Sequence, residues 1–241
     1  MILMIFGFTL GCFSVGALVL YKSNQKVNPK TKRERWIKYL GYLLIVHLVI
    51  GSALMGPLYF MTLVAVVVIM GAYELFRVCL NKEFSIARLP TMITSLGLYF
   101  ILAYGLLLFA QLSSSETIIF VYMVVAALDG FSQVTGDLMG SHPLAPRLSP
   151  KKTVEGAVGG FAAAIITAII LRSLAELSIS EALIAGFLLS AAGFAGDLSA
   201  SYFKRVHGVK DFGQILPGHG GVLDRFDSLL AAAPTFLLWG R

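Results

Sequence analysis

The stretch 91-TMITSLGLYFILAYGLLLFA-110 decides the fold, because its twenty residues include no charged side chain. A helix needs about 20 consecutive apolar residues to cross a hydrocarbon core about 30 Å thick. The whole chain has the same character: of 241 residues, 57% are hydrophobic and 13% are charged, and the mean hydropathy is +0.82. Soluble domains contain about 45–50% apolar and about 25% charged residues. The composition therefore predicts an integral membrane protein.

Apolar segments of this kind recur along the chain and predict an all-α, polytopic bundle of about eight transmembrane helices. Gly56-Pro57 is expected to form a tight hairpin between the second and third helices. The first segment begins at Met1 without a basic region, so we expect a retained helix rather than a cleaved signal peptide. The predicted segments are residues 1–21, 39–56, 58–76, 91–110, 118–139, 157–177, 182–203 and 222–239.

Basic residues divide the connections into two sets. Sixteen of the nineteen Lys and Arg residues lie in four alternate connections, and the opposite connections contain almost none. By the positive-inside rule, the basic connections face the cytoplasm and both termini lie outside. Orientation and anionic headgroups thereby account for the net charge of +6, so we expect no nucleic-acid partner. The four basic connections are residues 22–38, 77–90, 140–156 and 204–221.

Five aspartates lie within or at the ends of the apolar segments. A carboxylate at the bilayer centre costs about 2.5–3.5 kcal/mol, so such residues normally face a polar cavity, a partner or an ion. Asp197, Ser201 and Lys204 fall at i, i+4 and i+7 and share one helix face. Two carboxylates from different helices suit a Mg²⁺ ion that holds a nucleotide phosphate, whereas structural pairing with nearby Lys and Arg is the alternative. The five are Asp129, Asp137, Asp197, Asp224 and Asp227.

Two loops carry glycines beside basic residues. In 149-SPKKTVEGAVGG-160 the lysines precede a helix N-terminus, where backbone N–H groups favour anions. The loop is not a Walker A motif, and an ordinary positive-inside loop would also carry lysines. The run 217-PGHGG-221 cannot sustain a regular helix and is expected to form a tight loop close to a ligand. We expect His219 to serve as a turn residue or an indirect hydrogen-bond donor rather than as a base.

The run 201-SYFKRVHGVKDFGQILPGHGGVLDRFD-227 resembles the signature of phosphatidate cytidylyltransferases, also called CDP-diacylglycerol synthases. That signature is Ser, two residues, Lys-Arg, four residues, Lys-Asp, a short gap, His-Gly-Gly, two residues, Asp-Arg, one residue and Asp. Every fixed position is present. The segment 149-SPKKTVEG-156 is similar to the family's second block, SPxKTxEG, and Gly196-Asp197 matches the Gly-Asp pair that precedes the signature.

The resemblance implies transfer of CMP from CTP to phosphatidic acid, giving CDP-diacylglycerol and pyrophosphate, by a homodimer with active-site loops facing the cytoplasm. In a bacterium this places the protein in the inner membrane. The cofactor implied is Mg²⁺, with a second cation as an option, and Asp197 and Asp224 would be the metal ligands. Lys204, Arg205 and Asp227 would join these two aspartates in catalysis. The implied substrate-binding residues are Ser201, Lys151, Lys152, Thr153, Glu155, Lys210, Asp211, His219, Gly220, Gly221, Arg225 and Asp129.

The resemblance covers about residues 125–230. We therefore expect one continuous membrane domain in which residues 1–120 form divergent N-terminal helices and residues 121–241 form the catalytic region. A CTP-dependent transferase with another lipid phosphate or a polyprenol as acceptor is one alternative, and an ion-coupled transporter is another. A binding or scaffold protein with a decayed site is a third, but decay should have removed some fixed signature position, and none is missing. Family members commonly have an Ala-Tyr pair where this chain has Ser132 and Gln133. A CDP-alcohol phosphotransferase is excluded, because its DGxxAR core is not present after Asp129.

Overall fold

The computed structural model describes residues 2–80, 89–215 and 220–240. Within these ranges each of the eight predicted segments is helical, and seven of the helices are long and apolar enough to cross a membrane. The chain is therefore a multi-pass integral membrane protein. The helices are α1 (Ile2–Ser23), α2 (Pro29–Met55), α3 (Pro57–Leu80), α4 (Leu89–Leu112), α5 (Ser115–Met139), α6 (Val154–Leu171), α7 (Ile179–Val206) and α8 (Leu223–Trp239), with short 3₁₀ turns at Asn24–Lys26 and Arg172–Ala175.

Polar caps and one glycine set several helix boundaries. The side chain of Asn28 accepts a hydrogen bond from the Thr31 N–H at 2.8 Å, directly before α2. Ser178 and Glu181 form a capping box at the start of α7. Between α2 and α3, Gly56 has a φ of 123°, which favours glycine. The predicted hairpin at Gly56-Pro57 is thereby confirmed.

Two basic connections differ from the prediction. Residues 22–38 do not form a loop, because α1 extends to Ser23 and α2 begins at Pro29. Residues 30–40 contain no Gly or Pro, and Lys, Arg and Glu are good helix formers, so the helix continues through the charged run. The connection 140–156 contains an antiparallel pair of strands, β1 (Pro143–Ala145) and β2 (Ser149–Thr153), which was not predicted.

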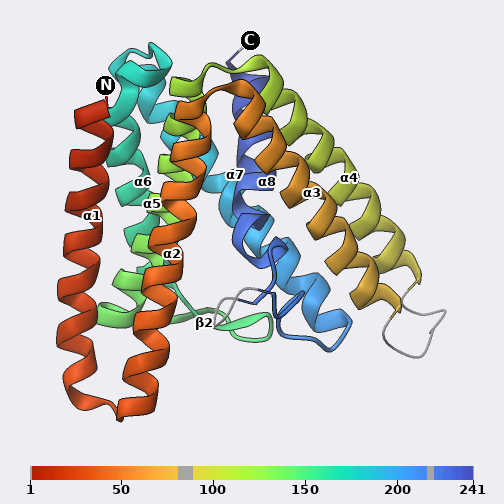
Figure 1. The fold of residues 1–241 in the computed structure, drawn as a ribbon. Helices are drawn as coiled ribbons and strands as arrows, with labels where there is room; N and C mark the ends of the chain where they lie inside the picture. The colour runs from red at the N-terminus through yellow and green to blue at the C-terminus, as the bar shows by residue number, and fades with distance from the viewer. Residues whose placement is uncertain (1, 81–88, 216–219, 241) are drawn as a thin grey trace.

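The helices place the described basic connections at one end of the bundle. Figure 1 shows both chain ends at the top, and the α1–α2 turn, the β1–β2 hairpin and the segment that follows α7 at the bottom. In the same view α7 and α8 lie at the centre, between the α1–α2 pair and the α3–α4 pair. This alternation agrees with the predicted order of crossings.

The core of the bundle is built around α5, α7 and α8. Eight consecutive residues of α5, from Ile118 to Val125, are buried, so this part of the helix is covered on all sides. Large apolar side chains on the outer helices are exposed, for example Leu58 at 75% and Ile69 at 68%. Such faces are suited to contact with lipid tails. With the outer helices facing lipid, the polar residues of α5, α7 and α8 lie in the interior.

Gly105 provides a test of the contact between α4 and α8. A Cβ at this position would lie 2.8 Å from both Cβ and Cγ of Pro234, whose ring cannot rotate away. Gly105→Ala is expected to lower the free energy of unfolding by about 1–3 kcal/mol, because it overpacks this contact. Gly97→Ala, in the same helix, meets nothing within 4 Å and is expected to leave stability unchanged or slightly higher. Unfolding titrations in detergent micelles would measure both, and equal effects would contradict close packing at Gly105.

Candidate active site

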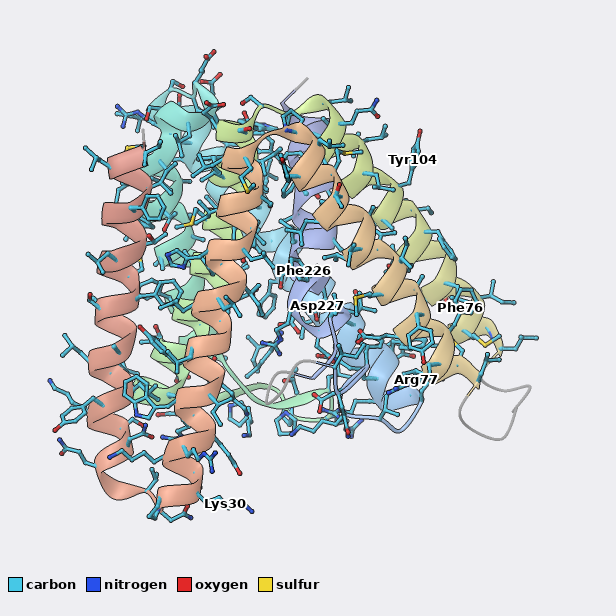
Figure 2. All side chains as sticks on the ribbon, in the orientation of Figure 1. Lys30, Phe76, Arg77, Tyr104, Phe226 and Asp227 are labelled. Carbon is cyan, nitrogen blue, oxygen red and sulfur yellow. The ribbon has the colours of Figure 1, made fainter. Side chains whose placement is uncertain are left out.

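Three aspartates from three helices lie close enough to interact electrostatically. They are Asp129 of α5, Asp197 of α7 and Asp227 of α8. Figure 2 shows Asp227 inside the bundle, whereas Tyr104 lies on the outer side of α4 and Lys30 at the end with the basic connections. Because like charges repel strongly where water is excluded, these carboxylates require nearby cations or donors.

Donors from α8 meet two of these carboxylates. The Ser228 hydroxyl donates to Asp129 Oδ1 at 3.1 Å, which links α8 to α5. The backbone N–H of the same residue donates to Asp227 Oδ1 at 2.8 Å. Ser228 therefore lies between two of the three acidic side chains and holds each in place.

Small residues bring α7 and α8 together at this level. A Cβ on Gly196 would lie 2.7 Å from the carbonyl oxygen of Asp227 and 2.8 Å from the Cβ of Ala231. A Cβ on Gly193 would lie 3.3 Å from Leu128 of α5. Small residues are what allow membrane helices to approach closely. Gly196 therefore fixes the distance between its neighbour Asp197 and the backbone of α8.

Lys152 reaches Asp197 from the β1–β2 hairpin. Its ammonium, on β2, donates to Asp197 Oδ2, and it also lies 5.0 Å from the centre of the Phe194 ring. On the other oxygen, Oδ1, Asp197 accepts from the Ser201 hydroxyl at 3.5 Å. Asp197 and Ser201 thus share one face of α7, as their spacing predicts. The hairpin closes over this face through a charged hydrogen bond.

Lys204 and Asp224 form a second, more deeply buried pair. The Lys204 ammonium lies 2.6 Å from Asp224 Oδ1, and the two side chains are 9% and 3% exposed. The other oxygen, Oδ2, accepts from the N–H groups of Phe212 at 2.8 Å and Gly221 at 2.9 Å. The ammonium also lies 5.0 Å from the centre of the Phe212 ring. A buried ion pair is tolerated only with further hydrogen bonds, and here two N–H groups satisfy the second oxygen of the carboxylate while an aromatic ring faces the ammonium.

The described part of the glycine-rich loop lies against carboxylates. Gly220 has a φ of 85°, and a Cβ there would lie 2.8 Å from Asp224 Oδ2. Gly220 is therefore required both by the backbone conformation and by the space available. Gly221 contacts Asp224 through its N–H group. The predicted roles of His219 concern a residue outside the described ranges.

Thr153 and Glu155 have local partners. Thr153 is the N-cap of α6, and its hydroxyl accepts from the Gly156 N–H at 3.1 Å. Glu155 accepts from the N–H groups of Ser141 at 3.1 Å and His142 at 3.2 Å, and it pairs with the His142 ring at 2.5 Å. In this structure both side chains fasten the β1–β2 hairpin to the first turn of α6.

Arg205 also contacts the hairpin. Its guanidinium donates to the carbonyl oxygens of Leu148 at 2.8 Å and Val209 at 3.1 Å, so it ties the β1–β2 turn to the end of α7. Four other residues predicted to bind substrate are exposed: Lys151, Lys210, Asp211 and Arg225. Of these, Arg225 lies close enough to Asp129 for an electrostatic interaction.

The glycines of the 149–160 segment pack α6 against α5. A Cβ on Gly156 would lie 2.7 Å from the carbonyl oxygen of Ser132, and one on Gly160 would lie 2.7 Å from that of Leu128. Gly160 also contacts the Ser132 side chain. Helix packing therefore accounts for these glycines without an anion. It also explains Ser132, because a small residue is needed at this crossing.

The aspartate pattern missed a fully buried carboxylate, Glu74, in the apolar helix α3. The rule that intramembrane acids need a partner would have identified it from the sequence. Ser228 was missed as well, and no sequence pattern distinguishes it from other small helix residues.

The predicted metal ligands have other partners in this structure. Among the residues in the described ranges, no group of three or more His, Cys, Asp and Glu side chains is arranged to hold one. The predicted ligands Asp197 and Asp224 each pair with a lysine ammonium. Mg²⁺ takes one or two carboxylates together with water and substrate phosphate. In this structure both predicted ligands are occupied by lysine ammonium groups, and Asp224 Oδ2 also accepts two N–H groups, so an ion would bind the two aspartates in exchange for these partners.

Comparison with known proteins identifies the family. The model of the cytidylyltransferase family matches residues 98–240. The chain belongs to this family. The matched range of this cytidylyltransferase-family chain begins within α4 and contains every predicted site residue. The resemblance inferred from residues 125–230 is thereby confirmed.

Individual relatives carry a more specific name. A protein of Staphylococcus saprophyticus named phosphatidate cytidylyltransferase is 46% identical over 119 residues, which cover 48% of this chain and 46% of the relative. A protein of Brucella abortus with the same name is 44% identical over 125 residues, which cover 52% of this chain and 46% of the relative. The chain spans about half the length of the curated relatives it matches.

The energetic coupling of the buried pair of Lys204 and Asp224 can be measured. Lys204→Met removes the ammonium and leaves a buried charge held only by N–H groups, so we expect a loss of about 3–5 kcal/mol in unfolding free energy. Adding Asp224→Asn removes that charge and is expected to recover part of the loss. Unfolding titrations of the two single variants and the double variant would measure the coupling. Strictly additive effects would contradict an energetic role for the pair.

Proposed function

We propose that the chain transfers CMP from CTP to phosphatidic acid, producing CDP-diacylglycerol and pyrophosphate. The observation that carries this proposal is a pair of carboxylate–lysine contacts, Asp197 with Lys152 and Asp224 with Lys204. They join β2, α7 and α8 beside the glycine loop of a membrane bundle. Both contacts lie within residues 98–240, which match the cytidylyltransferase family model, and relatives named phosphatidate cytidylyltransferase align with about half of the chain.

The chemistry explains why such a site is built from acids and bases. An oxygen of the lipid phosphate attacks the α-phosphorus of CTP. A new P–O bond forms as the bond from the α-phosphorus to the bridging oxygen breaks, and pyrophosphate leaves with that electron pair. Two anions must approach, so charge neutralisation and in-line positioning are the main requirements. A phosphate monoester has a second pKa of about 6 and is already a nucleophile near pH 7, so no dedicated base is needed.

The residues divide this work between them. Asp197 and Asp224 would hold Mg²⁺, which when bound supplies positive charge to the phosphate oxygens. Lys152 and Lys204, which now neutralise these carboxylates, would then extend their charge to the substrate phosphates. Asp227 interacts electrostatically with Asp197, Asp224 and Lys204. Its carboxylate would offset part of the positive charge that Mg²⁺ and the lysines bring to the site. The exposed bases Lys151, Lys210 and Arg225 would attract the triphosphate of CTP.

Membrane placement follows from the acceptor. The acyl tails of phosphatidic acid stay in lipid while its headgroup reaches the site at the end of the bundle. We infer that this end faces the cytoplasm, where CTP is made, and in a bacterium the membrane would be the inner one. A homodimer is the assembly expected for this function.

Another lipid phosphate or a polyprenol remains the alternative acceptor, because the proposed site residues recognise phosphate rather than lipid tails. Membership of the cytidylyltransferase family counts against an ion-coupled transporter. Acceptor competition distinguishes the lipid candidates: excess phosphatidic acid should abolish labelling of any other acceptor if phosphatidic acid is preferred.

The central test is an assay of purified protein in mixed micelles with Mg²⁺, labelled CTP and phosphatidic acid. We expect labelled CDP-diacylglycerol, and at least a ~100-fold lower rate for Asp197→Asn and Asp224→Asn, since each removes charge stabilisation of several kcal/mol. Asp137→Asn is the matched control, because Asp137 is an exposed aspartate near the same end. A parent protein that forms no CDP-lipid with phosphatidic acid would refute this acceptor.

Metal removal gives a separate test. Chelation is expected to stop CMP transfer and added Mg²⁺ to restore it, since carboxylates and phosphates are the ligands that this ion accepts. Asp197→Asn should require more Mg²⁺ for half-maximal rate than the Asp137→Asn control. Rates would be measured against free Mg²⁺ concentration. Full activity in the presence of chelator would show that no metal is involved.

A further inference from the structure

Glu74 is a carboxylate buried in α3, outside residues 98–240 that match the family model. Its exposed fraction is 0%, although it follows the apolar run 57-PLYFMTLVAVVVIMGAY-73. A buried charge without hydrogen bonds is very costly. The partners that Glu74 finds therefore indicate what holds it inside the bundle.

Those partners are backbone groups at the start of α8. The N–H of Val222 donates to Glu74 Oε1, and the N–H of Leu223 donates to Oε2, both at 2.9 Å. Val222 is the N-cap of α8, and no side-chain cap forms there. Glu74 therefore caps α8 from a helix 148 residues earlier in the chain. Its negative charge is also favourable at the positive end of the helix dipole.

Two glycines make room for this carboxylate. A Cβ on Gly213 would overlap Glu74 Oε1, and a Cβ on Gly221 would lie 2.6 Å from the carboxylate carbon. Both glycines belong to the segment that carries the signature. A need for space beside Glu74 thus explains their identity, in addition to any contact with substrate.

Glu74 and Asp224 hold adjacent peptide groups of the same segment. Phe212 and Gly221 donate their N–H groups to Asp224. The residue after Phe212 is Gly213, which packs against Glu74, and the residue after Gly221 is Val222, which donates its N–H to Glu74. Arg77, one turn further along α3, donates to the carbonyl oxygen of Phe212 at 3.4 Å. The end of α3 therefore contacts the loop on both sides of residues 214–220.

We propose that Glu74 is a positioning residue for the CMP-transfer site. By fixing the first turn of α8 and the ends of the signature loop, it sets where Asp224 and Asp227 lie relative to α7. Glu74 itself acts through the backbone and makes no contact with substrate. This inference rests on the proposed function, so its test includes a measurement that does not depend on activity.

The test compares Glu74→Gln with the parent protein. Gln has nearly the same size, but it places an NH₂ donor against one of the two N–H groups. We expect kcat to fall by about 10- to 100-fold, as for residues that orient a ligand side chain. The KM for phosphatidic acid should stay within about twofold, because binding of the lipid is not altered. Hydrogen exchange at the amides of Val222 and Leu223 should become faster.

Glu181→Gln is the matched control. Glu181 also caps a helix, accepting from the Ser178 N–H at 2.8 Å, but at the start of α7, near the end of the bundle that holds the chain termini. It is expected to leave kcat and exchange at Val222 unchanged. Glu74→Asp keeps the charge and should retain more activity than Glu74→Gln, and the reverse order would overturn the role of the charge.

The two readouts separate the possible failures. If Glu74→Gln and Glu181→Gln give the same kcat and the same exchange at Val222 and Leu223, Glu74 has no positioning role. If the parent forms no CDP-lipid at all, the proposed function fails. The difference in hydrogen exchange at Val222 and Leu223 between Glu74→Gln and Glu181→Gln then decides whether Glu74 holds the start of α8.

Discussion

The ion pair between Lys204 and Asp224 is the interaction on which the arrangement of the site depends. Two nearly buried charges need further hydrogen bonds to be stable, and the chain supplies them to Asp224 by folding the segment after α7 back onto α8. The N–H groups of Phe212 and Gly221 reach the second oxygen of Asp224. A single carboxylate thereby fixes the end of one helix, the start of the next and the two ends of the loop between them.

Close approach of the helices is the second constraint. Lipid tails are as apolar as Leu, so membrane helices gain little from burying apolar surface against one another and instead rely on close contact. Gly196 permits α7 to lie against the backbone of Asp227, and Gly156 and Gly160 permit α6 to lie against α5. These residues place Asp129, Asp197 and Asp227 within electrostatic range. Glycines that resemble a phosphate loop in the sequence are here part of the helix packing.

The sequence predicted local features well because hydropathy and helical spacing are local. It predicted eight helices, the break at Gly56-Pro57, and the shared face of Asp197 and Ser201. The pairing of Lys152 with Asp197 could not be predicted, because it depends on a hairpin of two short strands that contain Pro143 and Pro150 and show little alternation. The extension of α2 to Pro29 was missed because charge was interpreted as a loop, although the same residues favour a helix.

Glu74 shows the limit of reasoning from motifs. Its contacts to Val222 and Leu223 join parts of the chain that no short pattern links, so the signature does not include it. A carboxylate can be held inside a membrane protein by the N-terminus of a helix as well as by a lysine, since both supply donors and positive potential. The structure uses both solutions around one loop: Asp224 of α8 pairs with an ammonium, and Glu74 of α3 pairs with the N-terminal end of α8. The segment between α7 and α8 is therefore held from α3, α7 and α8 together, and the contacts from α3 come from a part of the chain that lies outside the residues matched by the family model.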